Sequence, residues 1–322
     1  MNMTDNLQKF DRAVSFLTPR IAALLQGLPT ESKARVREVR LRAGKPLVLT
    51  CADETQFLFP PNRCSAIFGE TVAECSAAEL NDCFTRLCAY SVHSHRESIA
   101  SGFVTVEGGH RAGVCGTAVC EGDAVSAIRD ISAINLRIAG EYHGAADALY
   151  ERLFAQGLCS VILAGPPASG KTTLLRDLAR QLSGAQHARF VRCVILDERS
   201  EIAASHRCVP QNDVGINCDV LNAYPKAQGI QTALRCFAPE MILCDEVGGA
   251  AELSAIAQGV NSGVCFAVSA HAASHADLLR RSQLRQLYDT GAFDFVVLLA
   301  GGAAPCRIAQ IYAVSQLKGE LA

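Results

Sequence analysis

The sequence has no strong excess of charge of either sign, and this absence limits the partners that it can have. Its 322 residues include 30 lysines and arginines and 32 acidic residues, which gives a formal net charge of −2. Non-specific binding to nucleic acid depends on a strongly positive surface. We therefore expect no stable nucleic-acid complex, although this balance does not exclude a local basic patch.

Paired cysteine motifs and long apolar runs are also missing. The 15 cysteines are scattered and include no C-x-x-C pair, so the pattern favours neither a zinc ribbon nor a redox motif. No apolar run reaches the roughly 18 residues that a membrane span requires, and residues 1–10 lack an apolar signal core. We expect a cytoplasmic protein with reduced thiols that reaches a membrane only through a partner.

The hydrophobic pattern divides the chain into two parts. Residues 1–144 mix helical stretches with short strand candidates, and residues 103–106 and 112–115 are expected to form a β-hairpin. From residue 145 onward helical segments alternate with apolar strand candidates, which are typical of a parallel sheet covered on both faces. The strand candidates are 160–164, 191–196, 241–244, 264–269 and 294–299. We predict an α/β domain with a mostly parallel sheet over residues 145–322, preceded by a smaller α+β domain over residues 1–144.

Residues 165–172 read G-x-x-x-x-G-K-T, which is the phosphate-binding P-loop pattern. The glycines of such a loop let backbone N–H groups point at phosphate oxygens, and the helix that follows adds a favourable dipole. We expect Lys171 to reach the β- and γ-phosphates of ATP and the Thr172 hydroxyl to hold Mg²⁺. The predicted nucleotide-binding residues are Gly165, Pro166, Pro167, Ala168, Ser169, Gly170, Lys171, Thr172 and Thr173.

Two other strand candidates end in carboxylates, which a nucleotide-hydrolysing site needs. Asp245 and Glu246 follow the strand at 241–244. We expect Asp245 to hold Mg²⁺, partly through water, and Glu246 to orient or deprotonate the attacking water. Asp197 and Glu198 follow the strand at 191–196 and either share that task or form a solvated charged turn. The pattern does not decide whether Glu198 or Glu246 is the principal base.

Histidines also occur near the expected strand ends. His271 follows the strand candidate at 264–269, and we expect it to sense the γ-phosphate through a hydrogen bond. His271 and His275 are four residues apart, but the H-E-x-x-H glutamate and a third ligand are missing, so a metal pair is disfavoured. His93 and His95 are expected to be surface or packing residues.

Longer blocks carry a resemblance to a known family. Over nearly its whole length the chain resembles the stage III sporulation protein AA family of the type II/type IV secretion ATPase superfamily. Residues 197–202 resemble the acidic box of that superfamily, and residues 269–271 resemble its histidine box. The other similar blocks are 38–47, 90–93, 102–111, 209–215, 223–227 and 304–308.

The resemblance implies a RecA-like P-loop ATPase domain and a homo-oligomer that forms a hexameric ring, with ATP and Mg²⁺ bound near subunit and domain interfaces. It also implies a cytoplasmic motor for a membrane-embedded, secretion-like sporulation complex. One departure is that Gly248 and Gly249 stand where pilus-motor relatives often carry an arginine. Arg137, Arg207 and Arg235 stay open as candidates for stabilising transition-state charge, or as ordinary surface or salt-bridged residues.

Three functions are open at this level. The joint pattern favours an ATPase in which water attacks the γ-phosphate. A nucleotide-gated interaction module with little turnover is disfavoured by Glu246. A RecA-like nucleic-acid motor is disfavoured by the mildly acidic composition and by the lack of a basic, aromatic-rich stripe.

Overall fold

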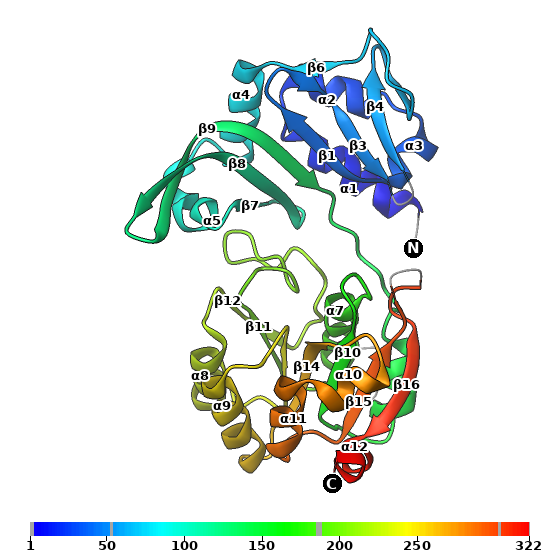
Figure 1. The fold of residues 1–322 in the computed structure, drawn as a ribbon, viewed down its shortest axis with the longest axis vertical. Helices are drawn as coiled ribbons and strands as arrows, with labels where there is room; N and C mark the ends of the chain where they lie inside the picture. The colour runs from blue at the N-terminus through cyan, green and yellow to red at the C-terminus, as the bar shows by residue number, and fades with distance from the viewer. Residues whose placement is uncertain (1–2, 52–53, 185–188, 302–303, 322) are drawn as a thin grey trace. The chain divides into compact units, whose positions relative to one another are not determined.

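The computed structural model describes residues 3–51, 54–184, 189–301 and 304–321. Its chain forms two units (Figure 1). The first consists of Met1–Gly140 with His206–Gln211, and the second of Glu141–Ser205 with Asn212–Ala322. The hydrophobic pattern placed a boundary between residues 144 and 145, and no pattern assigned residues 206–211 to the first unit.

An antiparallel sheet forms the centre of the first unit. Its strand order is β5-β4-β3-β1-β9-β8-β7, and every neighbouring pair is antiparallel. The expected hairpin is confirmed, since Phe103 pairs with Gly113 and Val106 with His110. The strands are β1 (Val36–Arg42), β3 (Val48–Cys51), β4 (Thr55–Phe59), β5 (Arg63–Ser65), β7 (Phe103–Val106), β8 (His110–Glu121) and β9 (Ala124–Arg137), and β2 (Lys45–Pro46) pairs with β6 (Glu74–Cys75).

Short helices supply the rest of the core of the first unit. Buried side chains of α1, α2 and α4, such as Phe10, Ile21 and Leu80, pack with buried strand residues such as Leu41 and Leu136 in one hydrophobic cluster. Burial of each of these side chains stabilises the folded state by roughly 1.5–3 kcal/mol. The helical segments are α1 (Met3–Ser15), α2 (Pro19–Gln26), α3 (Thr30–Arg35), α4 (Ala77–Leu87), η1 (Val92–His95) and α5 (Arg96–Ala100).

A mostly parallel sheet forms the centre of the second unit, as the apolar strand candidates predicted. Its order is β12-β11-β13-β14-β10-β15-β16. All pairs are parallel except β15 with β16. The strands are β10 (Val161–Gly165), β11 (Cys193–Asp197), β12 (Cys218–Asn222), β13 (Met241–Cys244), β14 (Cys265–His271), β15 (Phe295–Leu299) and β16 (Ile308–Ala313).

Alternate side chains of these strands enter two separate cores, because successive strand residues point to opposite faces. Val161 and Leu163 of β10 pack with α7 on one face. Ile162 and Ala164 of the same strand belong to the cluster on the other face, with residues of α8 to α12. The helices are α6 (Asp147–Leu149), η2 (Tyr150–Phe154), α7 (Lys171–Ser183), α8 (Lys226–Cys236), α9 (Ala250–Asn261), α10 (His275–Arg280), α11 (Ser282–Asp289) and α12 (Val314–Leu321). In the described part of the chain, no helix has the length and apolar character needed to cross a bilayer.

Candidate functional site

The strand order of the second unit brings the predicted residues together at the carboxyl ends of four neighbouring parallel strands. β14 lies between β10 and β13, and β11 lies on the other side of β13. Gly165 of β10 is level with His271 of β14, and Cys244 of β13 is level with Val268 of β14. Ligands of open parallel sheets bind at these strand ends.

The P-loop connects β10 to the first turn of α7. The two glycines of the P-loop pattern, Gly165 and Gly170, occupy positions where a side chain does not fit. Gly170 has φ +90°, and a Cβ there would lie 2.7 Å from the backbone nitrogen of Cys306. A Cβ on Gly165 would lie 2.3 Å from Ser169 Oγ. Ser169 Oγ is itself buried without a hydrogen-bond partner, so the loop holds a polar atom suited to a bound ligand.

Lys171 begins α7, and its ammonium group is bound by the loop. Nζ donates to the carbonyl oxygens of Gly165 and Pro166 at 3.0 Å each and lies 3.4 Å from His271 Nδ1. Burial lowers the pKa of the Lys171 amine, while the charges of Asp245 and Glu246 act in the opposite direction. A phosphate group in the loop would compete with these carbonyl oxygens for the three N–H donors.

The hydroxyl of Thr172 and the carboxylate of Asp245 form the pair that a Mg²⁺ site of this kind requires. Thr172 Oγ1 donates to Asp245 Oδ2 at 2.6 Å. Oxygen ligands of this type suit Mg²⁺, which usually retains water and substrate phosphate as its other ligands. The residues present therefore fit a magnesium ion that Thr172 and Asp245 would hold together. Thr173, also predicted at the nucleotide, is a partly buried residue of α7.

Ser269 of β14 connects the two acidic residues that follow β13. Its buried hydroxyl donates to Asp245 Oδ1 and accepts the backbone N–H of Glu246 at 3.0 Å. Glu246 has φ +50°, a backbone conformation that is uncommon outside glycine and that occurs at functional sites. The hydroxyl thus fixes both acids relative to β14.

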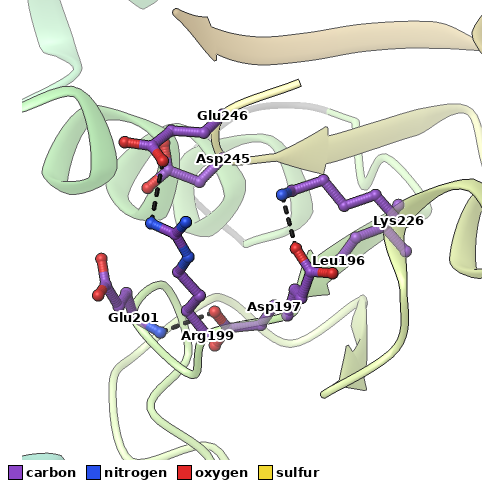
Figure 2. Close-up of a pocket in the computed structure, with 8 residues that line it drawn as sticks. Leu196, Asp197, Arg199, Glu201, Lys226, Asp245 and Glu246 are labelled. Carbon is purple, nitrogen blue, oxygen red and sulfur yellow. Dashed lines mark hydrogen bonds and ion pairs between the residues drawn. The ribbon is translucent and has the colours of Figure 1, made fainter. Parts of the chain in front are cut away.

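The carboxylate of Glu246 is held from two sides. His271 Nε2 lies 2.8 Å from Oε1. Arg199 Nη1 lies 3.0 Å from Oε2, and Figure 2 shows this second contact. Burial alone raises the pKa of Glu246, but the hydrogen bond from His271 and the charge of Arg199 hold it below its usual value. An imidazole protonated at Nε2 and free at Nδ1 satisfies both Glu246 and Lys171.

The acidic residues after β11 have partners of their own. Asp197 is buried, and its carboxylate accepts the backbone N–H groups of residues 201, 202, 203 and 204 at 2.8, 3.0, 2.8 and 3.3 Å. Glu198 Oε2 lies 2.6 Å from Nζ of Lys226, whose side chain is 9% exposed. Asp197 therefore stabilises the turn, and Glu198 is ion-paired. Both residues line one pocket together with Asp245 and Glu246 (Figure 2).

The other histidine and arginine candidates are exposed or have other partners. His275 Nε2 is 3.2 Å from Glu320 Oε2, whereas His271 contacts Lys171 and Glu246. Arg137, in the first unit, forms an ion pair with Glu38 at 3.1 Å. Arg235 is an exposed residue of α8. Also in the first unit, Arg207 is exposed, His93 is exposed, and His95 stacks on His206.

Sequence reasoning did not assign a role to Ser269, Arg199 or Lys226. All three stand inside blocks that carry the resemblance, but the contacts of Ser269 and Arg199 depend on the strand order β11-β13-β14. Lys226 is 28 residues from its partner Glu198, and a lysine at the start of a helix is ordinary in a sequence. Only the three-dimensional arrangement identifies these residues.

Comparison with known proteins supplies the family. A family model described as "Sporulation stage III, protein AA" matches residues 8–319. The chain belongs to this family. Stage III sporulation protein AA of Bacillus subtilis (strain 168) is 35% identical over 289 residues, which cover 89% of this chain and 90% of that protein. The predicted membership of the sporulation protein AA family is therefore confirmed.

Solved structures of other proteins are similar in fold to this member of the sporulation protein AA family. The ATPase DotB of Legionella pneumophila matches with a TM-score of 0.50 and 16% identity, over 82% of this chain and 72% of that one. DotB of Yersinia pseudotuberculosis matches with a TM-score of 0.50 and 13% identity, over 82% of this chain and 70% of that one. The chain thus has a fold similar to that of DotB, and the predicted α/β class is confirmed.

Proposed function

We propose that this chain is an ATPase that hydrolyses ATP to ADP and phosphate at the strand ends of its second unit. The observation that carries the proposal is the series of contacts from the P-loop to the acid after β13. Lys171 Nζ lies 3.4 Å from His271 Nδ1, and His271 Nε2 lies 2.8 Å from Glu246 Oε1. A phosphate bound by Lys171 would have a carboxylate and the imidazole that orients it close by.

The reaction assigns one task to each group. Backbone N–H groups of the loop and the Lys171 ammonium bind the phosphates of ATP. Glu246 accepts a proton from a water molecule, whose oxygen attacks the γ-phosphorus while the bond to the bridging oxygen of ADP breaks. His271 holds the Glu246 carboxylate through its Nε2–H. A magnesium ion held by Thr172 and Asp245 would supply positive charge for the phosphate oxygens.

Glu246 is the base in this proposal, and Glu198 is not. Glu198 forms an ion pair at 2.6 Å with Lys226, a lysine whose side chain is only 9% exposed. Protonating Glu198 would leave that buried ammonium without its partner, which is costly. Glu246 instead lies in direct contact with the histidine that contacts the P-loop lysine.

Two substitutions in the full chain test the ATPase assignment. We expect Lys171→Ala to abolish ATP binding, because the ammonium group that contacts the phosphates is removed. Glu246→Gln should retain ATP and lose turnover by about 10²–10⁴-fold, the usual contribution of a general base. Nucleotide binding by calorimetry and phosphate release should be measured with Mg²⁺. Lys318→Ala is the matched control, since Lys318 is a partly exposed lysine of α12, ion-paired with Asp289 and outside the pocket lining.

Either of two results would contradict the assignment. Phosphate release that persists in Lys171→Ala would exclude this P-loop as the site. Full turnover in Glu246→Gln would exclude Glu246 as the base.

A motor role in a sporulation-stage, secretion-like membrane complex is part of the same proposal. Membership of the sporulation protein AA family supports the sporulation role, and the DotB-like fold together with the sequence resemblance supports a ring-forming motor.

The Glu246→Gln chain should assemble into a larger particle with ATP and Mg²⁺, which mass measurement with and without nucleotide would detect. Placed in a spore-forming host instead of the native copy, it should bind ATP yet fail to support sporulation. Normal sporulation would favour a nucleotide-gated interaction module that does not need turnover.

A further inference from the structure

Arg199 lies on a turn whose backbone and flanking side chains are fixed. The carboxylate of Asp197 accepts four backbone N–H groups from residues 201–204, and Ser200 Oγ bonds Asn222 Oδ1 at 2.5 Å. Glu198, the residue before Arg199, is paired with Lys226. The Arg199 side chain points from this turn toward Glu246 (Figure 2).

The ion pair between Arg199 and Glu246 occupies one side of the proposed base. Arg199 contacts Oε2 at 3.0 Å, while His271 contacts Oε1 at 2.8 Å. Each carboxylate oxygen of Glu246 is therefore already engaged by a donor. A carboxylate in this state is a poor acceptor for the proton of an attacking water, because its negative charge is neutralised by the guanidinium.

The same ion pair is able to open. The side chains of Arg199 and Glu246 are 63% and 35% exposed, and ion pairs with this exposure to water are weak. The second cation of the pocket lining, Lys226, is buried and committed to Glu198. Arg199 is therefore the basic side chain of this pocket lining that can move to a new anion.

The contacts also lead from Arg199 to the P-loop. Arg199, Glu246, His271 and Lys171 form a continuous series, with separations of 3.0, 2.8 and 3.4 Å. The terminal phosphate of a nucleoside triphosphate bound at Lys171 would enter beside this series. A guanidinium group can bind two phosphate oxygens through two parallel hydrogen bonds. In its ion pair with Glu246, Arg199 contacts a single carboxylate oxygen, so phosphate is the stronger partner.

We propose that Arg199 is a nucleotide-sensing residue that holds Glu246 when no triphosphate is bound and transfers to the terminal phosphate when one binds. The inference rests on the proposed ATPase function and adds a regulation to it. The exchange frees Glu246 Oε2 for the attacking water only when a γ-phosphate is present. Hydrogen bonds are the only bonds that change in this step. A diphosphate lacks the group that Arg199 would bind, so the ion pair with Glu246 stays closed.

The test is a comparison of two nucleotides on the full chain. Dissociation constants of ADP and of a non-hydrolysable ATP analogue, both with Mg²⁺, should be measured by calorimetry. In Arg199→Ala we expect the analogue to bind about tenfold more weakly, equivalent to about 1.4 kcal/mol, and ADP to bind as before. Arg199→Lys should recover part of the analogue affinity, because it retains the charge but lacks the planar fork.

Arg192→Ala is the matched control. Arg192 is similarly exposed, at 59%, and forms an ion pair with Glu240 at 3.5 Å, just before β11 and outside the pocket lining. It should leave both dissociation constants unchanged. Circular dichroism would confirm that each variant is folded, as expected for exposed side chains.

A double-mutant cycle with Glu246→Gln separates sensing from simple phosphate attraction. If Arg199 must leave Glu246 before it binds phosphate, neutralising Glu246 should strengthen analogue binding in the presence of Arg199 and not in Arg199→Ala. Three results would overturn the sensing role and leave the ATPase assignment intact. In Arg199→Ala, ADP and the analogue could both bind more weakly to the same extent, or neither could bind more weakly. In the double-mutant cycle, the effects of the two substitutions could be independent. An unchanged chain that binds neither nucleotide would overturn the proposed function and this inference with it.

Discussion

At the carboxyl end of β14, the hydroxyl of Ser269 joins Asp245 to the backbone of Glu246. The residue is fully buried, so Ser269→Ala leaves the Glu246 N–H without a partner, which costs about 1–3 kcal/mol. We expect this loss in the unfolding free energy and, in addition, about tenfold slower ATP turnover, because both acids lose a contact that fixes them. Urea denaturation and phosphate release would measure the two effects.

The control for Ser269 is another buried serine that accepts a backbone N–H in the same sheet. Ser160 Oγ accepts the N–H of Phe266 at 3.1 Å, but it precedes β10 and so lies at the opposite strand ends. Ser160→Ala should cost similar stability and leave turnover unchanged. Equal slowing in both variants would mean that Ser269 acts only through stability.

The functional residues differ in how far a sequence could identify them. Lys171, Thr172 and Asp245 belong to two short patterns that are known to act together, and Thr172 and Asp245 do lie in contact although they are 73 positions apart. The partners of Glu246 are different, because no such pattern pairs Arg199 with the acid after β13. Such contacts depend on which strands become neighbours, and single-sequence periodicity carries no information on strand order.

At the scale of elements, the P-loop depends on a close approach to the segment before β16. The backbone N–H of Cys306 donates to the carbonyl of Ser169 at 2.8 Å, and a Cβ on Gly170 would lie 2.7 Å from that same Cys306 nitrogen. We expect Gly170→Ala to displace the loop and abolish nucleotide binding, since backbone atoms cannot rotate away as a side chain can. Calorimetry with ATP analogue would measure the loss.

Gly291 provides a control, because its φ is also positive but an added Cβ would not contact another atom. It has φ +67° and no atom within 4 Å of an added Cβ, so Gly291→Ala should cost only the left-handed strain, about 1 kcal/mol. Nucleotide affinity should be preserved in that variant. Nucleotide binding by Gly170→Ala at normal affinity would show that the contact with Cys306 is not required.

The strands of the second unit were predictable in proportion to their burial. The five apolar candidates correspond to β10, β11, β13, β14 and β15, whereas β12 and β16 were not identified as strands. Those two strands are the edges of the sheet, and both contain exposed and partly buried residues. Edge strands are covered less completely, so the apolar run that indicates a central parallel strand is absent from them.

At the scale of the whole molecule, the chain returns to the first unit for six residues that no sequence pattern indicated. His206 and Val209 exchange two backbone hydrogen bonds around Arg207 and Cys208, which both have positive φ. Gln211 Oε1 then accepts the N–H of Gly108 at 2.8 Å. The contact between Gln211 and Gly108 joins residues 103 positions apart, and neither turn composition nor hydrophobic period predicts it.

The stability of the two units should respond differently to acid. His110 is fully buried in the first unit, and its Nδ1 accepts the N–H of Ala139 at 3.1 Å. Burial, together with the charges of Lys9 and Arg12, lowers the pKa of His110 from 6.5 to about 4. Since the folded pKa is depressed, His110 contributes its full stability above pH 6.5, and that contribution is lost as the pH falls from 6.5 to about 4.

We therefore expect the first unit to lose about 3 kcal/mol of unfolding free energy through His110 over this pH range. His110→Asn should remove that loss, because the amide oxygen can accept the Ala139 N–H and does not titrate. Urea titrations at pH 7 and pH 4.5, read by pulsed hydrogen exchange, would follow β8 and β9 for the first unit and β10 and β14 for the second. The peptides of the second unit are the internal control, since the His110→Asn change should not alter their pH dependence. Parallel pH curves for β8 and β9 in the unchanged chain and in His110→Asn would show that the buried histidine does not couple protonation to the stability of the first unit.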